Sequence, residues 1–166
     1  RDIAVENDVT MVTRYPNGAT GCFITCTHDA IGTDRFEIDF SAGKIVVEDS
    51  RKATIYRMKI SEPEMNATMD MSQVARLMSS NNAGGAMYDT EVFEHTDAWG
   101  VQHGTVMENF ALHVLTGSEL LAPGSDGILS VRLANASQLS AWTGKTVSFP
   151  CDEAAYDAEL DKLILA

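Results

Sequence analysis

Two hydrophobic patterns divide the chain. Over the first sixty residues, apolar and β-branched side chains alternate with polar ones in short runs, the period-two pattern of half-buried strands. Strands joined by short turns pair as antiparallel neighbours, because a parallel pair needs a long crossover. The pattern predicts a meander of five strands at Val9–Tyr15, Ala19–Thr27, Arg35–Phe40, Lys44–Glu48 and Ala53–Ile60.

Turn residues separate these strands. Pro16-Asn17-Gly18 predicts a hairpin, since asparagine and glycine both tolerate positive φ. Ser41-Ala42-Gly43 and Asp49-Ser50-Arg51 predict two further tight turns, and a polar loop covers His28 to Asp34. The turns support antiparallel order along this part of the chain.

Residues 61–90 change character. Methionine, serine, asparagine and the pair Gly84-Gly85 dominate, and we expect a long loop with a short helix around Ser72–Ser79. The methionines are interpreted as adaptable packing rather than as a cofactor site. A sixth strand is expected at Thr90–His95.

The last third follows a helical period. A helix is predicted over His103–Thr116, with Gly117 as its C-cap, and a second from Gly127 to Trp142 after an Asp126 cap and before Gly144. A short strand at Thr146–Phe149 and a final acidic helix from Asp152 to Leu165 complete the prediction. Strands followed by helices indicate an α+β fold, an open and mostly antiparallel sheet with helices on one face, in a single domain over residues 1–166.

Composition and charge exclude some classes of binding partner. The chain has 166 residues, 45% of them hydrophobic, and 24 acidic against 12 basic residues for a net charge of −12. Nucleic-acid binding and anionic membrane surfaces both favour Lys and Arg, so we expect neither partner. The chain opens on Arg1, not Met, and lacks the apolar stretch of a signal peptide, so we expect an upstream segment.

The thiols show no functional pattern. Cys22, Cys26 and Cys151 form no C-x-x-C pair, and the first two lie about 13 Å apart if their strand is regular. We interpret all three as buried filler in a cytoplasmic protein, since free cysteine is usually buried.

Catalytic motifs are also absent. No glycine pattern matches a dinucleotide fingerprint or a P-loop. His28-Asp29 after Cys26 is read as a loop histidine rather than a zinc or thiol site, and His103 as an N-terminal capping group. The amides of Asn109 and Asn135 are expected to tie helices to loops. We therefore expect no catalytic, metal or cofactor-binding residues in this chain.

A resemblance to a known family suggests a function that the motifs alone do not. Ordered blocks along the whole chain resemble the C-terminal domain of the Gfo/Idh/MocA oxidoreductases. They are Val5–Thr10, Arg14–Gly21, Gly32–Ile38, Gly43–Glu48, Glu108–Phe110 with Gly117, Leu120–Gly124, Asp126-Gly127, Leu133–Ala136, Ser140–Trp142, and Val147–Pro150 with Asp152 and Tyr156.

The resemblance implies a division of labour. In that family an N-terminal Rossmann domain binds NAD or NADP, and the C-terminal domain supplies part of the substrate pocket and the oligomer interface. The family's catalytic E-K-P and D-x-x-x-H motifs are not in this sequence, where Glu62-Pro63 is the sole Glu-Pro. The resemblance therefore implies the substrate-binding half of an NAD(P)-dependent parent that acts on a sugar, inositol or related polyol, inactive as an isolated fragment.

The resemblance also nominates residues and partners. It places Thr27, His28, Thr33 and Asp34 at the cleft as substrate-binding residues. The implied partners are the parent's own N-terminal Rossmann domain, the polyol substrate and further copies of the chain, joined through the free sheet face as a homo-oligomer. Two alternatives stay open, a non-catalytic binding or assembly module and part of an NAD-dependent glycosidase of the same superfamily.

Overall fold

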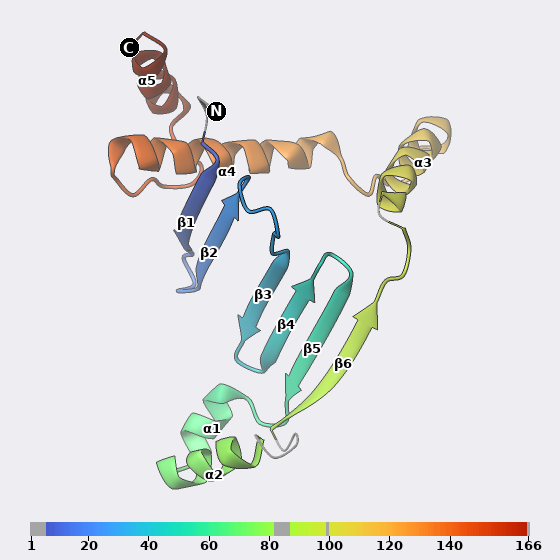
Figure 1. Cartoon of the computed structure of the whole chain (residues 1–166), viewed down its shortest axis with the longest axis vertical. Coiled ribbons are helices and arrows are strands. Elements are labelled where there is room, and N and C mark those ends of the chain that lie inside the picture. The colour runs from blue at the N-terminus through green and yellow to red at the C-terminus, as the bar shows by residue number, and fades with distance from the viewer. Residues whose placement is uncertain (1–5, 82–86, 99, 166) are drawn as a thin grey trace. The chain divides into compact units, whose positions relative to one another are not determined.

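The computed structural model describes residues 6–81, 87–98 and 100–165. It divides into two units, one made of Arg1–His28 and Trp99–Ala166 and the other of Asp29–Ala98. Every strand pair is antiparallel, in sheets of two and four strands accompanied by helices, so the predicted α+β class is confirmed (Figure 1).

The first unit begins with a hairpin of β1 (Asp8–Arg14) and β2 (Thr20–Cys26). The Asn-Gly turn prediction is confirmed. Gly18 adopts φ 87° and donates its N–H to the Tyr15 carbonyl at 2.9 Å, while the Asn17 side chain accepts from the amide of Ala19. The turn sets the register in which Val12 faces Cys22.

The predicted five-strand meander is wrong in one respect, because β1 and β2 form a two-stranded sheet of their own. The polar loop before β3 explains the break. Asp29 accepts the amide of Ile31 through its side chain, and Gly32 takes a left-handed φ of 71°. Both features make this loop irregular, unlike the tight turn that joins paired strands in a hairpin.

The second unit contains a four-stranded meander in the order β3-β4-β5-β6. Its strands are β3 (Arg35–Phe40), β4 (Gly43–Glu48), β5 (Lys52–Met58) and β6 (Tyr88–Glu94). Val46 and Thr54 face each other across β4 and β5 and are 4% and 6% exposed, so the buried centre of the sheet lies there. The predicted bounds of these strands are confirmed to within two residues.

Two helices, α1 (Glu62–Thr68) and α2 (Met71–Asn81), replace most of the loop expected between β5 and β6. Pro63 lies in the first turn of α1, where its missing N–H costs nothing. Asp70 and Gln73 form a reciprocal capping box at α2: the Asp70 carboxylate accepts the Gln73 amide, and Gln73 accepts the Asp70 amide. Bonds from the Ser72 side chain and the Gln73 amide lower the pKa of Asp70. The pair Gly84-Gly85 lies outside the described residues.

Packing between β5 and the two helices uses methionine, as predicted. Met65 is 7% exposed, and a void of about 20 Å³ beside it is enclosed mainly by sulfur and aliphatic groups. The lining residues are Met58, Lys59, Ile60, Met65, Leu77 and Met87. A flexible thioether fills such irregular space better than a branched side chain.

The first unit also holds α3 (Val101–Thr116), α4 (Gly124–Thr143) and α5 (Glu153–Ile164). The predicted C-caps at Gly117 and Gly144 are confirmed, both with left-handed φ. Gly100 is the N-cap of α3, without a side-chain cap bond, so the interpretation of His103 as the capping group is wrong. That residue lies one turn too late, at the third helical position.

The start of α4 and the segment after this helix differ from the prediction. Helix α4 begins at Gly124 after Pro123, and Asp126 lies in its first turn instead of capping it. The strand predicted at Thr146–Phe149 is wrong, because these residues pair with no strand in the described chain. Asp152 caps α5 by accepting two backbone amides.

Candidate functional site

The four nominated substrate residues fall at the boundary between the units. Thr27 and His28 end the first unit, and Thr33 and Asp34 belong to the second. The Thr27 amide donates to the Asn7 carbonyl at 2.9 Å and so extends the hairpin by one bond. All four side chains are exposed. Their polar groups are therefore accessible within the unit that carries each of them.

Asp34 is the best anchored of the four. Its Oδ2 accepts a hydrogen bond from the Ser50 hydroxyl at 2.5 Å, and its carbonyl accepts the Asp49 amide at 2.9 Å. These bonds fasten the start of β3 to the β4–β5 turn. The other carboxylate oxygen makes no hydrogen bond in the part of the chain that the structure describes, so it can accept one from a ligand hydroxyl.

The β4–β5 turn is strained. Asp49 and Ser50 adopt φ of 55° and 50°, and the Arg51 amide closes the turn onto the Glu48 carbonyl at 3.0 Å. Each non-glycine residue in this region costs on the order of 1 kcal/mol and persists only where neighbours hold it. The bonds from Asp34 supply that hold and fix where the Arg51 side chain emerges.

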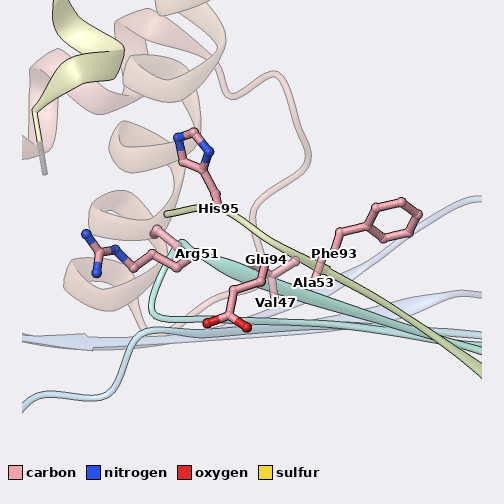
Figure 2. A pocket seen from close by; sticks show the side chains of 7 residues that line it. Val47, Arg51, Ala53, Phe93, Glu94 and His95 are labelled. Atoms are coloured by element: carbon pink, nitrogen blue, oxygen red, sulfur yellow. The ribbon is translucent and has the colours of Figure 1, made fainter. Parts of the chain in front are cut away.

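A depression of about 300 Å³ opens beside this turn (Figure 2). Its floor is one cross-strand row, in which Val47 faces Ala53 and Ala53 faces Phe93. Ala53 is the smallest side chain of the row, and the space above it is the hollow. Ser50, Arg51, Glu94 and His95 complete the lining.

Arg51 and His95 meet at the rim because the register that pairs Lys52 with Glu94 places them opposite each other. The His95 amide donates to the Arg51 carbonyl at 2.9 Å, and Arg51 Nη2 donates to the Asp97 carbonyl at 2.9 Å. His95 Nε2 lies 3.3 Å from Asp97 Oδ2. Neither rim residue was nominated from sequence, because the pairing of β5 with β6 joins residues that are distant along the chain.

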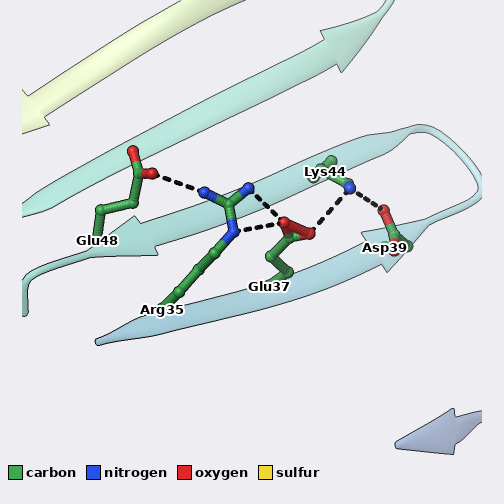
Figure 3. Close-up of polar contacts among 5 residues, drawn as sticks. All are labelled: Arg35, Glu37, Asp39, Lys44 and Glu48. Carbon is green, nitrogen blue, oxygen red and sulfur yellow. Dashed lines mark hydrogen bonds and ion pairs between the residues drawn. The ribbon is translucent and has the colours of Figure 1, made fainter. Parts of the chain in front are cut away.

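A charged network covers the other face of β3 and β4 (Figure 3). Arg35 Nη1 binds Glu48 Oε1 at 2.6 Å and also pairs with Glu37, whose second oxygen meets Lys44 Nζ at 3.1 Å. The Arg35 guanidinium, followed by the Lys44 ammonium, lowers the pKa of Glu37. The Glu37 carboxylate in turn raises the pKa of both Arg35 and Lys44. Exposed pairs of this kind add little stability, and they orient β3 against β4.

The described residues contain no metal-binding group, disulfide or membrane-spanning helix. No group of three His, Cys, Asp or Glu side chains there could hold a metal ion. All three thiols are free, with Cys22 exposed and Cys26 and Cys151 half-buried, so the expectation of buried thiols is wrong. No helix of the described chain has the length and apolar character that crossing a bilayer requires.

The glycines at the start of α4 do not form the phosphate cradle of a dinucleotide site. Gly124 and Gly127 lie in the first turn of α4, where a pyrophosphate-binding helix carries its glycines, but no strand leads into that turn. Loop residues and Pro123 precede it instead. The residues present therefore do not fit NAD or NADP.

A comparison with protein-family models identifies the family. The family model described as "Oxidoreductase family, C-terminal alpha/beta domain" matches residues 2–149. No curated protein matches the chain. The matched region takes in both units except α5 and the residues beside it.

Proposed function

The chain belongs to the Gfo/Idh/MocA oxidoreductase family, as its C-terminal alpha/beta domain, and on that premise we propose that it is the substrate-binding and assembly part of an NAD(P)-dependent oxidoreductase. The match over residues 2–149 is the observation that carries this proposal. The proposed substrate is a sugar, inositol or related polyol. The proposed partner is a Rossmann domain that holds the nicotinamide cofactor.

The proposed substrate contacts are the four exposed polar residues at the unit boundary. Hydride transfer is the chemistry of the nicotinamide, so the protein must orient a hydroxyl and exclude alternative poses. Thr27 and Thr33 offer hydroxyls that donate or accept, and His28 offers a ring nitrogen. Asp34 offers a carboxylate oxygen whose position the bond to Ser50 fixes.

Two measurements test this part of the proposal. The chain is incubated with NAD⁺ or NADP⁺ and a panel of sugars and polyols, and no reduced nicotinamide is expected. Sustained turnover, or release of a hydrolysed glycoside, would overturn the proposed inactivity of the isolated chain. In backbone-amide NMR, the bound polyol is expected to shift Thr27–Thr33, and Asp34→Asn is expected to weaken binding while the exposed Asp89→Asn control does not.

We also propose that the apolar face of the meander is the assembly surface. Alternation puts Phe36, Ile38 and Phe40 on one face of β3, opposite the charged network, and Phe36 and Phe40 are 57% and 54% exposed. Burial of apolar surface gives about 25 cal/mol per Å², so rings left in water favour a covered state. The proposed occupant is a second copy of the chain.

Sedimentation velocity tests this surface. Self-association at micromolar concentration is expected, and Phe36→Ser with Phe40→Ser is expected to yield a monomer. Replacing the exposed Met71 and Met78 of α2 with serine is the matched control and should leave the association unchanged. A wild-type chain that stays monomeric would refute the assembly role.

A further inference from the structure

Arg51 is a cation without a carboxylate partner. Of the six other bases in the second unit, four each form an ion pair and two, Lys52 and Arg76, form none within the described residues; the paired ones are Arg35, Lys44, Arg57 and Lys59. Arg51 forms none within the residues described, although the chain has twice as many acids as bases. Within the described residues, the Arg51 side chain makes one hydrogen bond, from Nη2 to the Asp97 carbonyl, which leaves the other donors of the guanidinium fork for a ligand.

The surroundings of Arg51 are apolar on the side of the hollow. Val47 and Ala53 are half-buried, and the Phe93 ring is 51% exposed. The hollow of about 300 Å³ lies at the lower end of the volumes of small-molecule sites, roughly 300–1,000 Å³. It therefore suits a small ligand that presents an apolar ring or chain to Phe93.

Neighbouring acids leave room for an anion at Arg51. Glu94 lies on the opposite side of the strand from Phe93 and His95, and Figure 2 shows its carboxylate directed away from them. The Asp97 carboxylate lies against the His95 ring. The Ser50 hydroxyl donates to Asp34, so it does not compete for the Arg51 fork.

From this geometry we propose that the depression binds a small organic carboxylate with an apolar body. The carboxylate accepts two parallel N–H bonds from Arg51, the planar fork-to-fork match that guanidinium makes best. The apolar body covers Ala53 and lies against Phe93. This site uses none of the side chains of the polyol contacts proposed above, and Ser50 at its edge is bonded to one of them, Asp34. Its floor shares a cross-strand row with Phe36 of the proposed assembly face, so the binding tests below use the monomeric chain with Phe36→Ser and Phe40→Ser.

Benzoate is the probe, and benzamide is its neutral match in shape. Titration of each into the ¹⁵N-labelled chain is expected to move the backbone amides of Ser50–Lys52 and Phe93–His95 saturably with benzoate. Benzamide is expected to bind at least about tenfold more weakly, since it carries no charge and offers one acceptor oxygen in place of the two of a carboxylate. Equal affinity for the two probes would overturn the proposal.

Three variants separate a built site from general electrostatic attraction. Arg51→Gln is expected to weaken benzoate binding by about tenfold or more. Lys52→Gln removes a neighbouring cation that also makes no ion pair in the described chain but lies on the other face of β5, so affinity should change less than about twofold. Ala53→Leu keeps every charge and fills the hollow, so it should abolish binding.

The outcomes are distinguishable. Equal losses in Arg51→Gln and Lys52→Gln would show diffuse charge attraction and refute the site. Unchanged binding in Ala53→Leu would refute the hollow as its location. If Ala53→Leu loses the dispersed amide spectrum of the folded chain, Phe93→Ala removes the apolar wall instead and carries the same expectation.

Discussion

Replacement of Gly43 by alanine tests how closely the β4 and β5 backbones approach each other in the meander. Gly43 begins β4, pairs with Phe40 and Arg57, and adopts φ 153°. A Cβ built there would lie 2.0 Å from the Tyr56 carbonyl oxygen, whereas real Cβ contacts essentially never fall below 3.0 Å. Because the Tyr56 oxygen is a backbone atom and cannot rotate away as a side chain could, β4 and β5 would have to separate locally by about 1 Å.

The cost follows from two effects. A side chain in this region of φ is strained by on the order of 1–3 kcal/mol. Separating β4 from β5 also lengthens at least one ladder hydrogen bond, which contributes about 1 kcal/mol. The expected loss in the free energy of unfolding is therefore about 3 kcal/mol. For a cooperative unit the size of Asp29–Ala98, that lowers the melting temperature by about 12 °C or more.

Thermal unfolding followed by circular dichroism measures this loss. Gly104→Ala is the matched control, since Gly104 lies within α3 and a Cβ there would meet nothing within 4 Å. That control is expected to stabilise its helix by about 0.5–1 kcal/mol. A Gly43→Ala chain that melts at the wild-type temperature would refute the close approach of β4 to the Tyr56 carbonyl.

Three further predictions concern hydrogen bonds and pH. Asn109→Ala removes the acceptor of the Leu121 amide at 2.8 Å and should lower stability by about 1–2 kcal/mol in urea unfolding; an unchanged midpoint would contradict the tie between α3 and its following loop. Tyr156→Phe removes the hydroxyl bonded to Gln138 at 2.9 Å and should cost about 1 kcal/mol in the same assay. An equal midpoint would show that the stacking of the Tyr156 ring on Trp142, with centroids 5.3 Å apart, holds α5 without this bond. The lowered pKa of Glu37 gives stability that is present above its ordinary pKa of 4.5 and is lost as the pH falls through the lower value of the folded chain. Glu37→Gln should therefore flatten the acid side of a curve of stability against pH. A variant curve identical to that of the wild type would contradict the network in Figure 3.

Strands could be predicted from sequence because their signals are local. Alternating side chains and the Asn17-Gly18 turn determine β1 and β2, and the same alternation determines β3 to β5. The short helix expected around Ser72–Ser79 is confirmed within α2, whereas α1 was missed, because methionine, asparagine and threonine hide its helical pattern. Their start signals are nonetheless in the sequence: Pro63 follows Ser61 by two residues, and Asp70 precedes Gln73 by three.

The rim of the depression could not be predicted in the same way. Arg51 and His95 are distant in sequence, and the register between β5 and β6 that joins them is not a local property. The bond between Asp34 and Ser50 likewise depends on where β3 begins relative to the next turn. The strand predicted at 146–149 failed for the converse reason, because a strand needs a partner as well as a suitable sequence.

Binding of the reduced cofactor tests the central claim most directly. The claim is that this chain forms the substrate and assembly part of an oxidoreductase and holds no dinucleotide itself. When the chain is titrated into NADH or NADPH and nicotinamide fluorescence is followed, neither intensity nor anisotropy is expected to saturate, with or without a polyol present. Saturable binding of either dinucleotide at micromolar concentration would contradict the account.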